Sequence, residues 1–364
     1  MSLIHDESQV AMATEVRRAL EARVTTADLL PLVEAKGQWH APFWDMAREQ
    51  GWCGVAIAEE FGGLGLGLVE QGLIAHQVGR SLAGAPFLTS GWAVARALAN
   101  SAHAGAKSQW LPRIASGETI AALGFAERQN PLPQRPALSF AQGQLHGTKP
   151  AVSGGSRADL ALLLAADGET PVLVLAELAG VERSVLGTYD NARCIADLVF
   201  AGQPAVALAR GDEAIALARD ALAALAVITA HEQTGGAEAL MERARDYALT
   251  RKAFGQPIGA FQSVKHRIAE LYGLVELARA GSIHAAARDG TAEFLRAAAA
   301  ARIQATEAYD TAARDCVQVH GGIGATWEAG LHLHMRRARS LANEAGNLLF
   351  WEDLLVNELE AEAA

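Results

Sequence analysis

The chain has 364 residues, of which 51% are hydrophobic and 20% charged, so it is long and apolar enough for two or three globular domains. Its 41 acidic residues outnumber its 31 Lys and Arg residues, and the net charge of −10 argues against nucleic acid or an anionic membrane as a partner. Three widely spaced cysteines (Cys53, Cys194 and Cys316) exclude a complete disulfide framework and a cysteine-based zinc site, and they fit a reducing compartment.

The first ten residues, MSLIHDESQV, carry two acidic side chains and no apolar run, which is unlike a secretory signal peptide. No uninterrupted apolar stretch approaches the roughly 18 residues that a membrane-spanning helix needs. From these two features we predict a soluble, cytoplasmic protein without a membrane partner.

The hydrophobic pattern changes twice along the chain. Residues 1–118 show apolar side chains at helical spacing, as in ATEVRRALEARV, with Gly-rich breaks such as EEFGGLGLGL. Residues 119–207 show short strand-like runs, and LALLLAADGETPVLVLAEL consists of two apolar runs around a turn signal, which predicts a β-hairpin. The first region therefore predicts a helical domain and the second a small β domain.

Helical spacing returns in the third region, residues 208–364, with one very long pattern that starts near 211. Three further helices are expected over roughly 262–288, 292–319 and 330–360, and four long helices joined by short loops predict an antiparallel bundle. The predicted fold class is therefore α+β: an N-terminal helical domain, a small central β-barrel or sheet, and a C-terminal four-helix bundle.

The stretch RKAFGQPIGAFQSVKHRIAEL, residues 251–271, places Arg251 at the end of the first long helix and Gln262 in the first turn of the next. A guanidinium group can bind phosphate through two hydrogen bonds, and a helix N-terminus also favours anions. The alternative is an ordinary helical hairpin whose basic residue complements the helix dipole.

The stretch DCVQVHGGIGATWEAGLHLHMRRAR, residues 315–339, follows a predicted helix end with Gly321, Gly322 and Gly324. Glycines leave backbone N–H groups open to a ligand such as a pyrophosphate, although this pattern alone is weak evidence. His332 and His334 point in different directions on a helix, so no metal site is predicted there.

Taken together, the pattern RxxFGxPIxxFQ followed by QVHGGxG resembles the acyl-CoA dehydrogenase family. Three further segments agree with this resemblance. The first, GWCGVAIAEEFGGLGLGLVEQGLIAHQVGRSLAGAPFL, resembles the N-terminal helical domain of that family. QWLPRIASGE resembles the passage into its β domain, and LHGTKPAVSGGSRADLALLLA resembles the strand pair that faces the flavin. The resemblance covers nearly the whole chain, in order.

The resemblance implies FAD bound between the β domain and the bundle, with part of each FAD held by a neighbouring subunit. By motif position, the cofactor-binding residues would be Arg251, Phe254, Gln262, Gln318, Gly321, Gly322, Val152 and Ser153. The implied reaction is α,β-dehydrogenation of an acyl-CoA, from a fatty acid or a steroid side chain, in which a carboxylate removes the α proton and hydride passes to flavin N5. The implied partners are an electron-transfer flavoprotein and further subunits, in a homodimer, a homotetramer or a heterotetramer.

This sequence departs from the family in the β domain. In GFAERQNPLPQ, Glu127 remains, but Ala126 replaces a hydroxyl residue and a Pro-rich loop replaces the Gly-Ser-Asp signature. Ala151 stands where many members have the tryptophan that covers one face of the flavin ring. Both departures affect the part of the family's site that lies near the thioester and the flavin.

The catalytic base is the second departure. The position of the family's C-terminal glutamate falls on Ala345, so that Glu344 is one residue early and, on a helix, rotated by about 100°. The alternative family position, on the first long bundle helix, falls on Leu225. Glu232 lies two turns further along the same face among apolar residues, which makes it the first candidate base and Glu344 the weaker one. The alternative for Glu232 is a buried ion pair with a neighbouring Arg or His.

Three hypotheses of function follow. The first is an active FAD-dependent acyl-CoA dehydrogenase with an atypical base. The second is a non-catalytic or half-site subunit that pairs with a related chain. The third is a family member with altered chemistry on a CoA thioester that needs no α-proton base.

Overall fold

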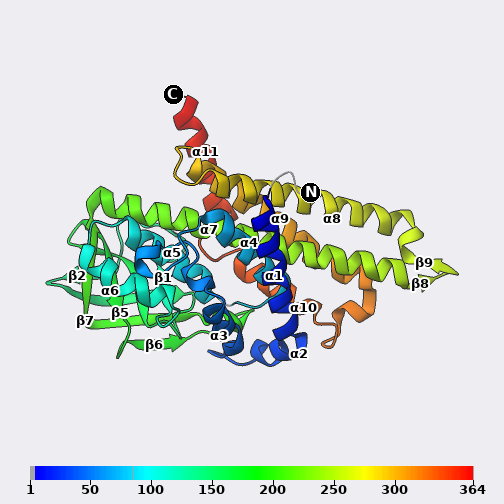
Figure 1. Ribbon diagram of the computed structural model, residues 1–364, viewed down its shortest axis with the longest axis horizontal. Helices are drawn as coiled ribbons and strands as arrows, with labels where there is room; N and C mark the ends of the chain where they lie inside the picture. Colours follow the sequence, from blue (N-terminus) through cyan, green and yellow to red (C-terminus); the bar gives the residue numbers. More distant parts are fainter. Residues whose placement is uncertain (1–4, 85, 364) are drawn as a thin grey trace.

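Helices from both ends of the chain lie side by side, and a small β-barrel occupies one end of the molecule (Figure 1). The computed structural model describes residues 5–84 and 86–363. The order of helices, then strands, then helices confirms the α+β fold class that the sequence predicts.

The N-terminal region is helical, as expected from its apolar spacing. Its α-helices are α1 (Glu7–Arg23), α2 (Thr26–Leu29), α3 (Ala41–Glu49), α4 (Leu68–Ser81), α5 (Pro86–Asn100) and α6 (Ala104–Ala115). Helix α1 begins with a capping box, in which Asp6 accepts a hydrogen bond from the Gln9 N–H at 2.8 Å and Gln9 accepts one from the Asp6 N–H at 3.2 Å.

The central strands form a closed ring. They are β1 (Ala121–Gly124), β2 (Ser139–Ala141), β3 (Gln144–Val152), β4 (Leu160–Asp167), β5 (Thr170–Glu177), β6 (Glu182–Val185) and β7 (Ala196–Arg210). Each strand of the series β4, β2, β3, β7 and β5 pairs with the next, and β5 pairs back with β4. Strand β1 adds to β4 and β6 adds to β7. Gly168, with a φ of 61°, turns β4 into β5, which confirms the predicted hairpin.

The C-terminal helices are α7 (Gly211–Thr250), α8 (Gln262–Ala287), α9 (Phe294–His320), α10 (Leu331–Leu341) and α11 (Leu348–Ala363), and the short hairpin β8 (Lys252–Ala253) and β9 (Gln256–Pro257) joins α7 to α8. The first three helices match the predicted ranges closely. The single helix predicted over 330–360 is wrong, because the chain leaves helical geometry after Leu341 and starts again at Leu348.

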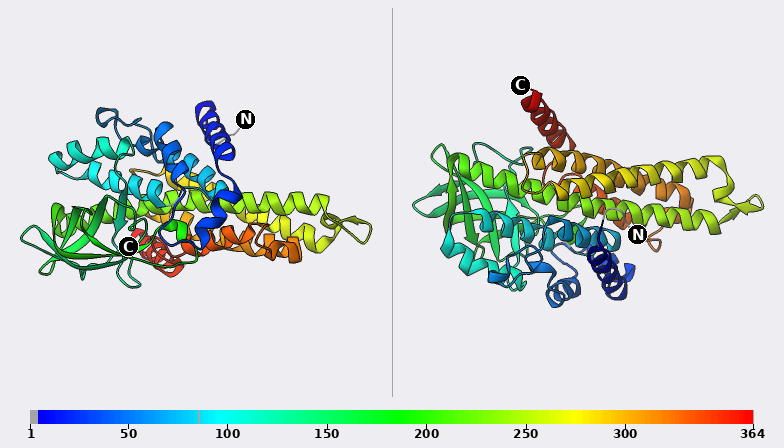
Figure 2. Two further views of the ribbon diagram at one scale, coloured as in Figure 1. Left: turned by 90° about the horizontal axis from the view of Figure 1, so that it is seen from below. Right: turned by 45° about the horizontal axis from the view of Figure 1, so that its top comes forward.

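Two residues account for this break. Ala345 and Gly346 have φ angles of 56° and 105°, which no right-handed helix accommodates. Asn347 then starts α11, because its side-chain oxygen accepts a hydrogen bond from the Phe350 N–H at 3.0 Å. Helix α11 points away from the other helices as a result (Figures 1 and 2).

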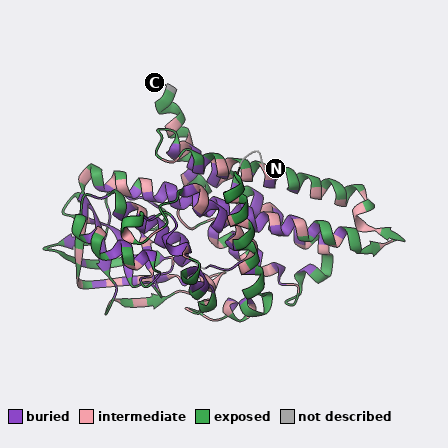
Figure 3. Cartoon of the chain, viewed as in Figure 1, coloured by how far each residue is buried: buried purple, intermediate pink, exposed green. Residues whose placement is uncertain are grey.

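Helix α7 is the central helix of the molecule, and most of its middle is buried (Figure 3). Within residues 5–84 and 86–363, it is the one helix long and apolar enough to cross a membrane by length and composition, and 67% of its most apolar window is buried inside the protein. Its hydropathy therefore serves the core of the bundle.

Glycines bring α4 and α7 into backbone contact. A Cβ atom on Gly79 would lie 1.8 Å from the carbonyl oxygen of Glu232, and one on Gly235 would lie 1.9 Å from the carbonyl oxygen of His76. No side chain fits at either position without moving a helix. This contact fixes the N-terminal domain against the segment of α7 that carries Glu232.

A cluster of part-buried charges also joins α4, α7 and α8. His76 Nε2 and Arg80 Nη1 lie 2.6 and 2.9 Å from the carboxylate of Glu238, and Arg279 contacts its other oxygen. Burial alone would raise the pKa of the Glu238 carboxyl, but His76, Arg279 and Arg80 outweigh burial and lower that pKa to about 2.

Glu238→Gln should therefore weaken the acid-induced loss of stability. The ionised carboxylate stabilises the fold above its ordinary pKa of 4.5, and this stabilisation is lost as the pH falls toward about 2. The wild type should exceed the variant in unfolding free energy by on the order of 2 kcal/mol at neutral pH, and the gap should shrink below pH 4.5. Urea unfolding at a series of pH values measures the gap, and a gap that stays constant with pH would contradict this assignment.

Candidate active site

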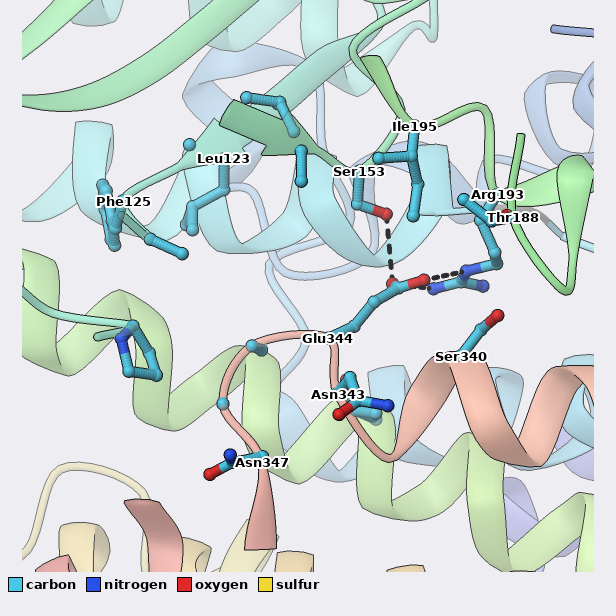
Figure 4. Close-up of a pocket in the computed structure, with 18 of the residues that line it drawn as sticks. Leu123, Phe125, Ser153, Thr188, Arg193, Ile195, Ser340, Asn343, Glu344 and Asn347 are labelled. Carbon is cyan, nitrogen blue, oxygen red and sulfur yellow. Dashed lines mark hydrogen bonds and ion pairs between the residues drawn. The ribbon is translucent and has the colours of Figure 1, made fainter. Parts of the chain in front are cut away.

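A cavity of about 970 Å³ lies between the β-barrel, α7 and the segment that joins α10 to α11 (Figure 4). Part of its wall is apolar and comes from the barrel and from α7, through Leu123, Phe125, Ile195, Leu222 and Leu225. A cavity with apolar walls and a few polar groups is the ordinary form of a small-molecule site.

The charged side chains that line the cavity are Arg128, Arg193, Arg336, Arg339 and Glu344. Glu344 is thus the one carboxylate among the described residues that line it. Arg193 and Arg339 are paired with carboxylates, which leaves the guanidinium groups of Arg128 and Arg336 available to an anionic ligand.

Glu344 lies in the non-helical segment between α10 and α11, and its side chain points into the cavity (Figure 4). Arg193 donates two hydrogen bonds to its carboxylate, from Nε to Oε1 at 2.8 Å and from Nη2 to Oε2 at 2.7 Å. Ser153 Oγ donates a third to Oε2 at 3.0 Å. The rotation of about 100° that argues against Glu344 on a helix does not apply here, because this segment is not helical.

The backbone of Glu344 is held as well. Arg302, which lies in α9 and is almost fully buried, donates from Nη2 to the Glu344 carbonyl oxygen at 3.0 Å and also to that of Leu341. Burial lowers the pKa of Arg302 to about 10, against the opposing effect of Glu344 and Glu232, so the group remains a cation at neutral pH. Both the main chain and the carboxylate of Glu344 are therefore fixed.

Behind Arg193 lies a line of alternating charges. Arg193 Nη1 lies 3.2 Å from Glu232 Oε1, and Arg337 Nη1 lies 2.8 Å from the same oxygen. Arg337 Nε also donates to Asp190 Oδ2 at 2.5 Å. Five charged groups thus run in the order Glu344, Arg193, Glu232, Arg337 and Asp190, which we call the charge row.

The structure brings Glu344, rather than Glu232, to the cavity. Glu232 is 1% exposed, does not line the cavity and pairs with Arg193 and Arg337. This is the buried ion pair that the sequence leaves open as the alternative for Glu232. His231, its neighbour, lies against Ser282 with Nε2 3.1 Å from that carbonyl oxygen, and burial lowers the pKa of His231 to about 3.

The residues expected to meet the flavin ring, Val152 and Ser153, line the cavity at the end of β3. Ala151 precedes them with a φ of 48°, and its N–H donates to Asp197 Oδ1 at 2.7 Å. Gly154 donates its N–H to the carbonyl oxygen of Arg193 at 3.0 Å. The same turn therefore orients Ser153 and ties it to the segment that carries Arg193.

The Pro-rich loop after Glu127 forms one rim of the cavity. The carboxylate of Glu127 accepts from the Ala137 N–H at 2.6 Å and pairs with Lys149, whose ammonium group is buried. Burial lowers the pKa of Lys149, and Glu127 partly opposes this. Glu127 therefore holds the loop in place, while Arg128 carries a charge to the cavity wall.

The other predicted cofactor residues gather at the opposite end of the bundle: Arg251, Phe254, Gln262, Gln318, Gly321 and Gly322, all exposed. Tyr247 stacks on His320 with ring centroids 4.2 Å apart, which joins the end of α7 to the Gly-rich turn after α9. Thr229 lines the cavity, and Arg251 follows about 22 residues later, or roughly 33 Å along a helix. One chain therefore separates its predicted cofactor residues into two distant groups.

Sequence reasoning missed Arg193, Arg302 and Arg337, which fix the pocket carboxylate or its neighbours. Arg193 ends the 3-10 turn η4 (Asn191–Arg193), which is capped by Asp190 and lies between two strands. No periodicity marks it, because its role depends on contacts with α7 and with the segment after α10.

Two family models match the chain: "Acyl-CoA dehydrogenase, N-terminal domain" over residues 6–118 and "Acyl-CoA dehydrogenase, C-terminal domain" over residues 215–348. Acyl-CoA dehydrogenase IpdE2 of Mycobacterium tuberculosis is 32% identical over 305 residues, which cover 82% of this chain and 80% of the relative. The chain belongs to the acyl-CoA dehydrogenase family. This confirms the resemblance inferred from the two motifs, and it makes the chain an oxidoreductase of the class that acts on CH–CH groups.

Solved structures agree on the fold of this acyl-CoA dehydrogenase. The ChsE4–ChsE5 complex of Mycobacterium tuberculosis matches with a TM-score of 0.88 at 24% identity, over 99% of both chains. The steroid acyl-CoA dehydrogenase Tcur3481–Tcur3483 matches with a TM-score of 0.85 at 23% identity, over 98% of this chain and 99% of that one. Among residues 5–84 and 86–363, no group of three or more His, Cys, Asp or Glu side chains could hold a metal ion.

Proposed function

We propose that this chain is an FAD-dependent acyl-CoA dehydrogenase in which Glu344 is the catalytic base. The observation that carries the proposal is the carboxylate of Glu344, the one acidic side chain among the described residues lining a cavity that Val152 and Ser153 also line. Glu232 has its carboxylate between two arginines and away from the cavity, so we assign it the role of a counter-ion.

The chain's residues supply the proton transfer. Glu344 takes the α proton of the acyl thioester, and the electron pair of the broken C–H bond forms the new double bond between the α and β carbons. The bound flavin supplies the acceptor for the hydride that leaves the β carbon. Arg193 and Ser153 hold the carboxylate, and part of the cavity wall beside it is apolar.

The residues present fit FAD in two places. The cavity offers the Ser153 hydroxyl and an apolar wall for a flat ring, beside bare backbone at Gly124. At the far end of the bundle, a Cβ atom on Gly321 or Gly322 would meet nothing within 4 Å, so this turn leaves room for a ligand, and the exposed Arg251 offers a guanidinium group to a phosphate. These features support a dinucleotide whose two ends are held by different regions.

The distance between the two regions supports an oligomer. A single FAD would have to reach roughly 33 Å to meet both groups in one chain, as the rise of α7 implies. We therefore propose that the far end of one chain completes the FAD site of another, in a homodimer, a homotetramer or a heterotetramer. The oxidant of the reduced flavin would be an electron-transfer flavoprotein.

The second candidate is a half-site subunit that works with a related chain. Two observations favour it: Ala345 occupies the family's base position, and Ala126 with the Pro-rich loop replaces the usual flavin-side signature. A solved structure of the same fold is a complex of two named chains, ChsE4 and ChsE5. In this case the chain alone would bind FAD poorly and gain it only with its partner.

The test begins with the colour of the purified chain. A homomeric enzyme should carry about one FAD per chain and lose its yellow colour when an acyl-CoA is added without oxygen, as the family reaction implies. A panel of short, long, aromatic and steroid thioesters would identify the acyl group. A colourless chain that gains flavin only with a co-expressed paralogue would support the half-site candidate. A flavin-loaded protein that no thioester bleaches would contradict both.

A further inference from the structure

Glu344 lies at the cavity wall, and its carboxylate accepts three hydrogen bonds, two from Arg193 and one from Ser153. Arg193 binds both of its carboxylate oxygens, at 2.8 and 2.7 Å, in the two-pronged geometry that gives the strongest ion pairs (Figure 4). The side chain of Glu344 is 14% exposed and that of Arg193 is 2% exposed, so water screens this pair weakly. A carboxylate held in this way has one orientation.

Arg193 is itself fixed from behind. Its third contact is Glu232, and Arg337 holds Glu232 in turn. Burial alone would lower the pKa of Arg193, but Glu344 and Glu232 outweigh burial and raise it, so the guanidinium group is a permanent cation. The three carboxylates and two guanidinium groups of the charge row sum to one negative charge, and Glu344 and Arg193 are the members that line the cavity.

The hydrogen bonds of Arg193 also show that it binds the carboxylate of Glu344 more closely than that of Glu232. It gives Glu344 two hydrogen bonds of 2.8 Å or less, and it gives Glu232 a single contact at 3.2 Å. A residue needed only to neutralise Glu232 would turn its two-pronged face toward Glu232. Arg337 already neutralises Glu232 at the shorter distance of 2.8 Å.

We propose that Arg193 is the positioning residue of the active site, which holds the carboxylate of Glu344 aimed into the cavity. This inference rests on the proposed function, because it gives Arg193 its role through the base. Glu232, Arg337 and Asp190 would then support Arg193, which explains why a buried glutamate occurs on α7 without lining the cavity. Breaking a buried ion pair on one side leaves an uncompensated charge, so each member depends on the next.

Two variants test the role of Arg193 in the holoenzyme. Arg193→Lys keeps the charge and the fold but cannot bind both carboxylate oxygens at once. It should slow flavin reduction by acyl-CoA at least about 10-fold, with the dissociation constant of the acyl-CoA changed by less than about 3-fold. Arg193→Ala should slow reduction about 100-fold, and guanidinium ion added to the buffer should restore at least about 10-fold of this loss.

The matched control is Arg183→Ala. Arg183 lies in β6 of the same domain, and its partners among the described residues are the carbonyl oxygens of Gly155 and Leu178, so the rate should stay within about 2-fold of the wild type. Normal reduction in Arg193→Lys and Arg193→Ala, beside a slow Glu344→Gln, would overturn the positioning role while leaving the proposed function intact.

Thermal unfolding of the same chain gives a second readout that needs no turnover. Arg193→Ala and Glu344→Ala should each lower Tm, and the double variant should lower it by less than the sum of the two shifts, because each single change leaves an unpaired charge. Additive shifts would overturn the proposed contact. This readout tests the contact between Arg193 and Glu344 even if no acyl-CoA reduces the flavin, a result that would count against the proposed function and not against the contact.

Discussion

Glu344→Gln should slow the reduction of the bound flavin by an acyl-CoA about 10³-fold, the scale of a lost general base. The amide keeps the size and one acceptor of the side chain but cannot take a proton. Arg193 and Ser153 can still contact it, so the variant should fold and retain flavin. Anaerobic stopped-flow absorbance at the flavin band measures the rate.

Glu232→Gln is the matched comparison, since it removes the other candidate carboxylate from the same charge row. Glu232 meets Arg193 and Arg337 and does not line the cavity, so we expect a loss of less than about 10-fold in rate together with a lower Tm. If Glu232→Gln were inactive and Glu344→Gln kept a rate near the wild type, Glu232 rather than Glu344 would be the catalytic base, as the sequence alone suggests.

Arg251→Glu should yield a chain that binds FAD at least about 100-fold more weakly, because the change replaces an exposed cation in the region proposed to hold the phosphates with an anion. Arg251 is exposed, so the fold should be unaffected. The neighbouring exposed change Lys252→Gln is the control and should leave flavin content unchanged. Flavin absorbance per chain, measured after gel filtration, reports the result.

Arg251→Glu and Glu344→Gln should also complement each other. A mixed dimer contains one Arg251→Glu chain and one Glu344→Gln chain. If the far end of each chain completes the FAD site of its partner, the cavity of the Arg251→Glu chain keeps its own Glu344 and receives a normal Arg251 from the partner. Equal co-expression should give roughly a quarter of wild-type activity, since half of the dimers are mixed and each of those has one intact site of two. Inactive mixed dimers would show that both residues serve the same site within one chain.

Much of the fold follows from the sequence because its signals are local. The spacing of apolar residues gives the long helices, and the turn signal between two apolar runs gives the β4–β5 hairpin. Closure of the barrel depends on β2 pairing in parallel with β4 and on β7 crossing between β3 and β5. These pairings join distant segments, and no local pattern specifies them.

Local sequence patterns also fail to specify the contacts of the candidate site. Counting along a motif led to the segment around Ala345, which lines the cavity, but the expected continuous helix is wrong, so the rotation assigned to Glu344 does not apply. Ala345 adopts a positive φ that its residue type does not suggest, and Gly346 extends the break. Arg193 could not be ranked at all, since its two carboxylate partners come from α7 and from the segment after α10.

The most direct test of the central claim, that Glu344 removes the α proton, follows that proton itself. An acyl-CoA analogue with no hydrogen on its β carbon and deuterium on its α carbon can lose the α label to water but cannot complete the reaction. Mass spectrometry should show rapid loss of the label with the wild type and with Glu232→Gln, and none above background with Glu344→Gln. Loss of the label at the wild-type rate with Glu344→Gln would contradict the account.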